Sequence, residues 1–201
     1  NVQLTIEDYI QSEFEKVFKG RLGALVAIEP STGQVLAFVS APTYDGNQFV
    51  DGISEVAWKE LNESKSRPLF NRALQGAYPP GSTYKPFMAL AALHSGARAR
   101  DEVIRYGGVY LLGSHRYRDS TGGRGHGMVN MFTSIAVSSD VYYYSLAHKM
   151  GVDLMHQEIA RFGFGQKTGI DLLGETEGLL PSSEWYKKKT GKDWSEGQTI
   201  S

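Results

Sequence analysis

The sequence of 201 residues contains no cysteine, so disulfide bonds, thiolate metal ligands and a cysteine nucleophile are excluded. It also lacks an apolar run of the roughly 18 residues that a membrane-spanning helix needs. Neither charge is in excess, since 21 Lys and Arg face 22 Asp and Glu, and a polyanion such as nucleic acid is therefore not an expected partner. No signal peptide is visible, and the abrupt apolar start leads us to expect a segment of a longer chain, with any membrane anchor upstream.

The patterns that are present indicate a mixture of helices and strands. Apolar residues at three- and four-residue spacing predict a helix over 5–18, with Thr5 as its N-cap. Two β-rich runs, 24–28 and 34–39, flank Pro30 and Gly33 and predict an antiparallel hairpin. Neither run alternates cleanly, so we expect helices on both faces and an α+β architecture. Further helices are predicted at 87–93, 132–137, 141–150 and 153–162, and the glycine-rich stretch 107–127 is interpreted as surface loops.

The strongest chemical signal is the segment Tyr78-Pro79-Pro80-Gly81-Ser82-Thr83-Tyr84-Lys85-Pro86. Pro86 fits only in the first turn of a helix, so the helix begins near Ser82 or Thr83. Ser82 and Lys85 then share one face of the opening turn, as a nucleophile and its activating base. Burial and the helix N-terminus both favour the neutral amine that such a base requires. The alternative is that Ser82 or Thr83 merely caps the helix and Lys85 is a solvated surface residue.

A second motif, Ser138-Ser139-Asp140, lies between two predicted helices. The triad S-x-x-K, S-D-N and K-T-G is typical of serine acyl-transferases, and Ser138 fits the shuttling hydroxyl of the second member. Asp140 is placed to bond either the lysine or a substrate amide. The alternative is that the motif only caps the helix that follows it.

Two K-T-G triplets match the third motif in letters alone. One is Lys167-Thr168-Gly169 and the other is Lys189-Thr190-Gly191. The functional triplet must lie on a strand beside the nucleophile, and neither is embedded in β-rich sequence. We assign neither to the site.

With these motifs, the sequence resembles the transpeptidase domain of class B penicillin-binding proteins, and within them the elongation group typified by penicillin-binding protein 2. The lead-in Tyr78-Pro79-Pro80-Gly81 and Asp140, where many members have Asn, favour that group. The resemblance covers essentially the whole chain. It is carried by four segments, namely 23–47, 71–86, 138–144 and 162–172.

The resemblance implies a penicillin-binding or serine β-lactamase-like fold, in which an antiparallel sheet packs on helices beside a helical lobe. It implies that residues 1–201 form one transpeptidase domain, incomplete at its C-terminus, where the third-motif strand is missing. It implies D,D-transpeptidation of peptidoglycan stem peptides through a Ser82 acyl-enzyme that β-lactams also form, with no cofactor. The segment alone is expected to have little or no activity. Implied partners are a RodA-type glycan polymerase and an MreC-type scaffold, at the periplasmic face of the bacterial inner membrane.

Some members of the family bind zinc near the second motif. Asp119 and His126 fit two of the ligand positions, but Ser139 stands in the cysteine place and Tyr106 in an acidic one. A structural zinc site takes four ligands, so we predict no metal.

Two other functions remain open. A β-lactam-hydrolysing or β-lactam-sensing protein of the same fold would need an activated deacylating water, for which the sequence offers no residue that we can name. A non-catalytic interaction module is the other alternative, and the intact Ser82, Lys85 and Ser138 argue against it.

Overall fold

The computed structural model describes residues 3–200 and divides into two compact units, each of which is described by itself. The hairpin unit comprises Asn1–Ala77 and Ile170–Thr176. The helical unit comprises Tyr78–Gly169 and Glu177–Ser201. The assignment of residues 1–201 to a single domain stays a prediction.

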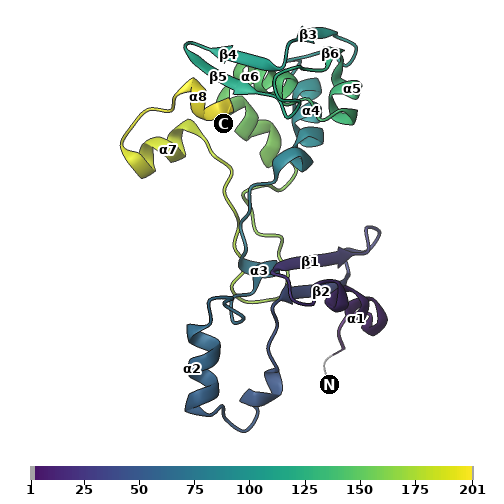
Figure 1. Cartoon of the computed structure of the whole chain (residues 1–201), viewed down its shortest axis with the longest axis vertical. Coiled ribbons are helices and arrows are strands. Elements are labelled where there is room, and N and C mark those ends of the chain that lie inside the picture. The colour runs from purple at the N-terminus through teal and green to yellow at the C-terminus, as the bar shows by residue number, and fades with distance from the viewer. Residues whose placement is uncertain (1–2, 201) are drawn as a thin grey trace. The chain divides into compact units, whose positions relative to one another are not determined.

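The hairpin unit is built around two antiparallel strands joined by a tight turn (Figure 1). Gly33 adopts φ 76°, a left-handed conformation that favours glycine, and its N–H donates to Glu29 O. The predicted hairpin is thus confirmed, with a register shift next to Ala27. The elements of this unit are α1 (Asp8–Val17), β1 (Gly23–Ile28), β2 (Val35–Ala41), the 3-10 turn η1 (Gly46–Phe49), α2 (Glu55–Glu63) and α3 (Arg72–Gln75).

Helix α1 packs against β2. The side-chain amide of Gln11 donates to Phe38 O and accepts from Phe38 N, so it completes the free edge of the strand. The prediction of Thr5 as N-cap is wrong, because its hydroxyl donates to Val35 O and the helix begins after Glu7. Within the described residues nothing covers Val26 and Ile28 of β1, which are 41% and 56% exposed, so the expected cover on both faces stays a prediction for this strand. An apolar run shows that a strand exists but not what covers it.

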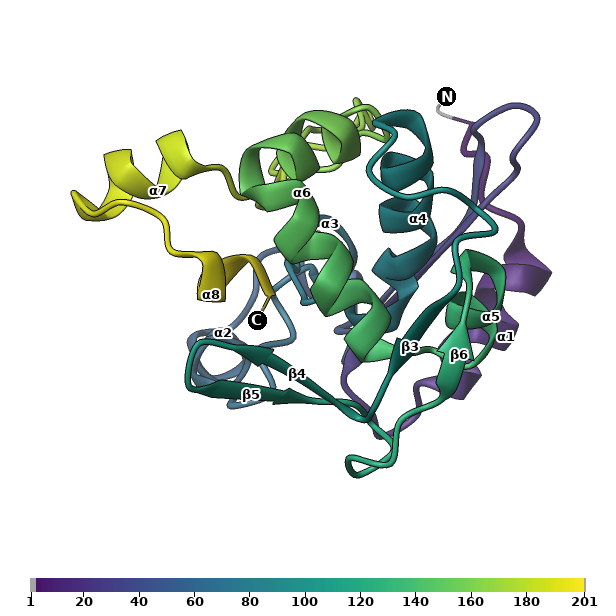
Figure 2. The same ribbon diagram turned by 90° about the horizontal axis from the view of Figure 1, so that it is seen from above.

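The helical unit has α4 and α6 at its centre, and Figure 2 shows these two helices side by side. Gly151, at φ 71° and ψ 161°, breaks α6 where the sequence predicted two helices with a gap. The elements are the 3-10 turn η2 (Gly81–Tyr84), α4 (Lys85–His94), β3 (Ile104–Tyr106), β4 (Val109–Leu112), β5 (His115–Arg118), β6 (Gly127–Val129), α5 (Met131–Ala136), α6 (Asp140–Ala160), α7 (Ser183–Thr190) and α8 (Glu196–Ile200).

The core of the helical unit lies between α4 and α6. Tyr142, Leu146 and Ile159 are fully buried there and pack with Met88 and Ala92 of α4. This packing fixes the starts of both helices, which carry the two sequence motifs. No helix within residues 3–200 is both long enough and apolar enough to cross a bilayer.

Two predictions fail in this unit. The glycine-rich stretch 107–127 is not a set of loops, because β4 pairs with β5 and β3 pairs with β6, with glycines at the turns between strands. Helix α7 was not predicted at all. Its signals were present, since Ser182 accepts a hydrogen bond from Trp185 N as N-cap and Gly191 adopts the left-handed conformation after the last turn.

Candidate active site

The first motif lies where the chain enters α4. Gly81, at φ 56°, turns the chain into the 3-10 turn that runs directly into the helix, and Pro86 occupies its first turn. The predicted helix start is confirmed. Ser82 is exposed, whereas Lys85 is only 8% exposed. An accessible hydroxyl therefore stands one turn from a buried amine.

The second motif lies in the connection between α5 and α6. Ser139 accepts a hydrogen bond from Tyr142 N, so the capping interpretation is confirmed for this one residue. The side chains of its neighbours, Ser138 and Asp140, make other contacts. Ser138 adopts φ 53°, which is uncommon for a residue other than glycine and is found where the surroundings impose it.

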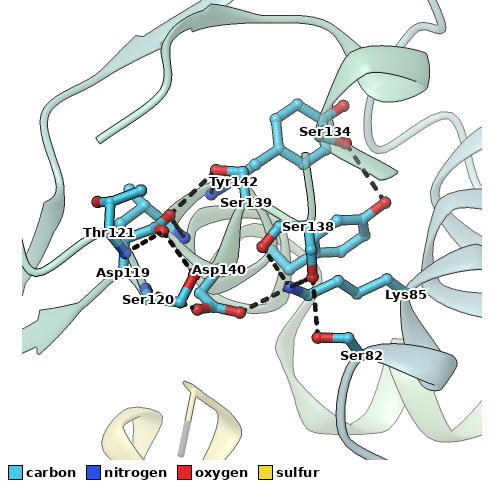
Figure 3. Close-up of polar contacts among 12 residues, drawn as sticks. Ser82, Lys85, Asp119, Ser120, Thr121, Ser134, Ser138, Ser139, Asp140 and Tyr142 are labelled. Carbon is cyan, nitrogen blue, oxygen red and sulfur yellow. Dashed lines mark hydrogen bonds and ion pairs between the residues drawn. The ribbon is translucent and has the colours of Figure 1, made fainter. Parts of the chain in front are cut away.

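The two motifs meet through the hydroxyl of Ser138 (Figure 3). Ser138 Oγ donates to Ser82 Oγ at 3.0 Å and accepts from Lys85 Nζ at 2.9 Å. The amine also donates to Ser138 O at 2.8 Å and to Asp140 Oδ1 at 2.6 Å. These three acceptors match the three hydrogens of an ammonium. The alternative of a solvated surface lysine is wrong.

This geometry differs in one respect from the simplest expectation of a direct serine–lysine pair. Among the described residues, no hydrogen bond joins Lys85 Nζ to Ser82 Oγ, and the Ser138 hydroxyl lies between them. Of the two partners proposed for Asp140, the structure shows the lysine. Its second oxygen accepts from Ser120 N at 3.1 Å, so both carboxylate oxygens are held.

This arrangement of two hydroxyls and a lysine can be compared with known proteins. Residues 23–201 match the family model of the penicillin binding protein transpeptidase domain. The chain belongs to this family.

Relatives in this family cover the chain from end to end. Peptidoglycan D,D-transpeptidase MrdA of Acinetobacter baumannii is 44% identical over 100% of this chain and 30% of its own length. The Escherichia coli K12 protein of the same name is 42% identical, over 100% of this chain and 32% of its own length. The chain thus spans about a third of the length of these relatives.

Solved structures agree with the sequence relatives. Pseudomonas aeruginosa PBP2 in complex with WCK 5153 superposes with a TM-score of 0.93 at 47% identity, over 98% of this chain and 45% of that one. Helicobacter pylori PBP2 in complex with MreC gives 0.95 at 33% identity, over 99% and 37%. The α+β transpeptidase fold is confirmed.

The two weak metal candidates lie together beside the second motif of this transpeptidase domain. His126 Nε2 is 3.2 Å from Asp119 Oδ1, and Ser139 Oγ donates to Asp119 Oδ2 at 3.3 Å. Tyr106 instead pairs with Gly127 between β3 and β6. Within residues 3–200, no three His, Cys, Asp or Glu side chains are grouped to hold a metal ion. Two ligands do not fit a structural zinc site.

Asp119 nevertheless is an unusual carboxylate, because it is only 4% exposed. Burial by itself raises the pKa of this carboxyl. Hydrogen bonds from the N–H groups of Val141 and Thr121, together with nearby His126, outweigh the burial, and the pKa lies below its usual value. Asp119 is therefore an ionised acceptor at neutral pH.

The sequence predicted that neither K-T-G triplet lies on a strand, and the structure confirms this. Residues 167–169 follow the turns after α6 and form neither helix nor strand. Lys189 and Thr190 end α7, and Gly191 is its left-handed cap. The local structure of both triplets is therefore accounted for without a role in the candidate site.

Sequence reasoning missed two contributors to the site. The ring of Tyr143 lies 5.6 Å from Lys85 Nζ, and its hydroxyl accepts from Ser134 Oγ at 3.3 Å. Its position three residues after Asp140 on the same helix was a signal that could have found it. Ser120 was missed because its contribution is a backbone N–H, which no side-chain pattern reveals.

Proposed function

We propose that the protein is a serine D,D-transpeptidase that cross-links peptidoglycan stem peptides. The observation that carries the proposal is the chain of contacts from Ser82 Oγ through Ser138 Oγ to Lys85 Nζ. The membership of the chain in the transpeptidase family supports the same chemistry. Curated relatives at 42–44% identity carry the name peptidoglycan D,D-transpeptidase.

In the first half-reaction, Ser82 Oγ attacks the carbonyl carbon of the penultimate D-Ala residue. In the structure Lys85 Nζ donates to Ser138 Oγ, and Ser138 Oγ donates to Ser82 Oγ, so this step requires Lys85 to be the neutral amine and both hydrogen bonds to reverse. The proton of Ser82 then passes to the Ser138 hydroxyl as that hydroxyl gives its own proton to Lys85 Nζ. The proton then returns through Ser138 to the nitrogen of the terminal D-Ala, which leaves as an amine. An ester between Ser82 and the donor peptide remains.

In the second half-reaction, an amine of a neighbouring stem attacks the ester carbonyl. The proton of this amine passes to Lys85 and returns through Ser138 to Ser82 Oγ, so that the ester C–O bond breaks and Ser82 is released as a hydroxyl while the C–N bond of the cross-link forms. The first N–H groups of a helix have no intrahelical partner, and Ser82 lies in the opening turn. One such donor aimed at the oxyanion contributes about 3–4 kcal/mol. Asp140 holds Lys85 in place rather than reacting.

The test is labelling, with a fluorescent penicillin, of a complete transpeptidase domain that contains this chain, because the segment alone is expected to have little or no activity. Wild type is expected to form a stable adduct, and Ser82→Ala is expected to form none. Ser95→Ala is the matched control, since this hydroxyl lies after the other end of α4 and donates to the backbone oxygens of Ala91 and Ala92. A folded wild type that is not labelled would support a non-catalytic module. Release of the label within seconds would favour a β-lactam hydrolase.

We further propose that the protein acts at the periplasmic face of the inner membrane with an MreC-type scaffold and a RodA-type glycan polymerase. A similar solved structure is a complex of PBP2 with MreC, and another is described as a peptidoglycan synthase complex that coordinates polymerization and crosslinking. Co-purification of the full chain with an MreC-type protein tests this assembly. Failure to co-purify under conditions that preserve penicillin labelling would contradict it.

A further inference from the structure

The Asp119 carboxylate is the most heavily hydrogen-bonded side chain next to the site. It lies in the turn after β5 and is almost fully buried. Its two oxygens accept from five donors within 3.4 Å, namely Ser120 Oγ, Thr121 N, His126 Nε2, Ser139 Oγ and Val141 N. Five donors divided between two side-chain atoms require both atoms to be acceptors. A carboxylate has two acceptor oxygens, whereas an amide has only one.

These contacts bind the start of α6 on both sides of Asp140. Asp119 Oδ2 holds Ser139 Oγ on one side and Val141 N on the other. The next residue, Ser120, donates its N–H to the Asp140 carboxylate itself. Residues 119 and 120 therefore hold three consecutive residues, 139–141, and Figure 3 shows the turn 119–121 facing Ser139 and Asp140.

Ser138 directly precedes the residues that this turn holds. Its backbone conformation, φ 53°, costs free energy and persists only when the surroundings impose it. Ser138 Oγ must lie within hydrogen-bond distance of both Ser82 and Lys85, and a displacement of about 1 Å would break one of the two contacts. Within the described residues no hydrogen bond or ion pair joins Asp119 to Ser82 or Lys85, so any effect on them passes through the second motif.

We propose that Asp119 is a positioning residue for the acylation of Ser82. Acting through Ser139 and Val141, it holds the Ser138 hydroxyl between the nucleophile and Lys85. The inference rests on the proposed function and adds a residue to it. It differs from a role in folding alone, because it requires the loss to fall on the chemical step.

The experiment measures acylation by a penicillin of a complete transpeptidase domain that contains this chain, and it separates the noncovalent dissociation constant from the first-order acylation rate. Asp119→Asn is expected to lower the acylation rate about tenfold and Asp119→Ala about a hundredfold, with the dissociation constant changed less than twofold. An asparagine keeps one acceptor and turns an amide N–H₂ toward a donor, so its effect is the smaller one.

Asp153→Asn is the matched control. Asp153 also accepts a backbone N–H and a hydroxyl at the start of a helix, from Ser183 N at 2.8 Å and Ser183 Oγ at 2.7 Å, but it serves α7. This variant is expected to lower the melting temperature and leave the acylation rate of the folded protein unchanged. The inference is overturned if the Asp119→Asn rate equals wild type, or if both aspartate variants lose acylation in proportion to their melting temperatures.

A double-mutant cycle covers the case in which Asp119→Ala does not fold. Asp119→Asn combined with Ser139→Ala should lower the acylation rate by less than the product of the two single effects, because both act through one contact. Full additivity would overturn the proposed route. Loss of wild-type acylation on addition of a chelator would show that Asp119 and His126 hold a metal ion instead, which also overturns the inference. A wild type that is never acylated would overturn the proposed function itself, and this inference with it.

Discussion

The hairpin unit and the helical unit bury their apolar residues to very different extents. In the described part of the hairpin unit, the buried hydrophobic residues are Ala37, Val39 and Ala41, all of them small and all in β2. The helical unit buries Tyr142 and Leu146 completely, within a continuous cluster. Every residue of the candidate site comes from the helical unit. Contacts of 2.6–3.0 Å between side chains far apart in sequence need the rigid support of a packed core.

The hairpin unit contains a large cavity. A cavity of about 800 Å³ lies within the hairpin unit, beside β2, and is lined by residues of α1, β2 and the segments 18–22, 42–46 and 66–71. Val26 and Ile28 of β1 are exposed on the sheet. A strand pair with one face open gains less from burial than two helices that cover each other.

The strongest test of this difference in packing is to replace one leucine in each unit by alanine. Leu146→Ala, at a fully buried position of α6, is expected to reduce the free energy of unfolding by about 3 kcal/mol, because it leaves a cavity. Leu25→Ala, at a half-buried position of β1, should cost about 1 kcal/mol. Urea unfolding of both variants measures the difference. Equal costs would mean that the hairpin unit is packed as tightly as the helical unit.

A change of pH tests two carboxylates of the helical unit that accept hydrogen bonds at the starts of helices. The pKa of Asp153 is lowered, chiefly by the hydrogen bonds from Ser183, and that of Asp119 is lowered as described above. A lowered folded-state pKa means that each carboxylate stabilises the fold fully above its unfolded value, near 3.8, and that this contribution disappears as the pH falls further.

Urea unfolding between pH 6 and pH 2.5 tests this expectation. Stability should be level near pH 6 and fall progressively below about pH 4. Asp153→Asn removes one of the two groups, so its stability should depend less steeply on pH over the same interval. An identical slope for variant and wild type would contradict the role given to Asp153.

The smallest expected effect concerns Tyr84, the residue before Lys85. Burial raises the pKa of this phenol to about 12, and its ring packs edge-on against Phe164. It is therefore neutral at every physiological pH and serves the core rather than proton transfer. Tyr84→Phe is expected to change the acylation rate by less than about twofold, since the ring contact remains. A tenfold loss in a pulse-labelling assay would show that the hydroxyl takes part in the reaction.

Several features were predictable because short stretches of sequence specify them. Pro86 in a first turn located the start of α4, and the gap between the predicted helices 141–150 and 153–162 coincides with the break in α6 at Gly151. The strands of residues 107–127 were not predictable in this way. Their glycines marked turns correctly, but each intervening run has only three or four residues, and its partner strand decides whether it pairs. Thr5 failed as a cap because Val35, thirty residues away, offered its carbonyl instead.

The sequence alone determined which reactive side chains are available. Ser82 and Lys85 are one helical turn apart, and Ser138 is separated from Asp140 only by the capping residue Ser139. These facts are local, since helical geometry and the restrictions on proline and glycine act over a few residues. Only the tertiary structure decided that the Ser138 hydroxyl lies between Ser82 and Lys85, 56 residues from the former. Only it decided that Asp119 receives donors from both sides of the second motif. The physical reason is that both depend on how α4, α6 and the turn after β5 pack, and packing sums many weak contacts that no single segment encodes.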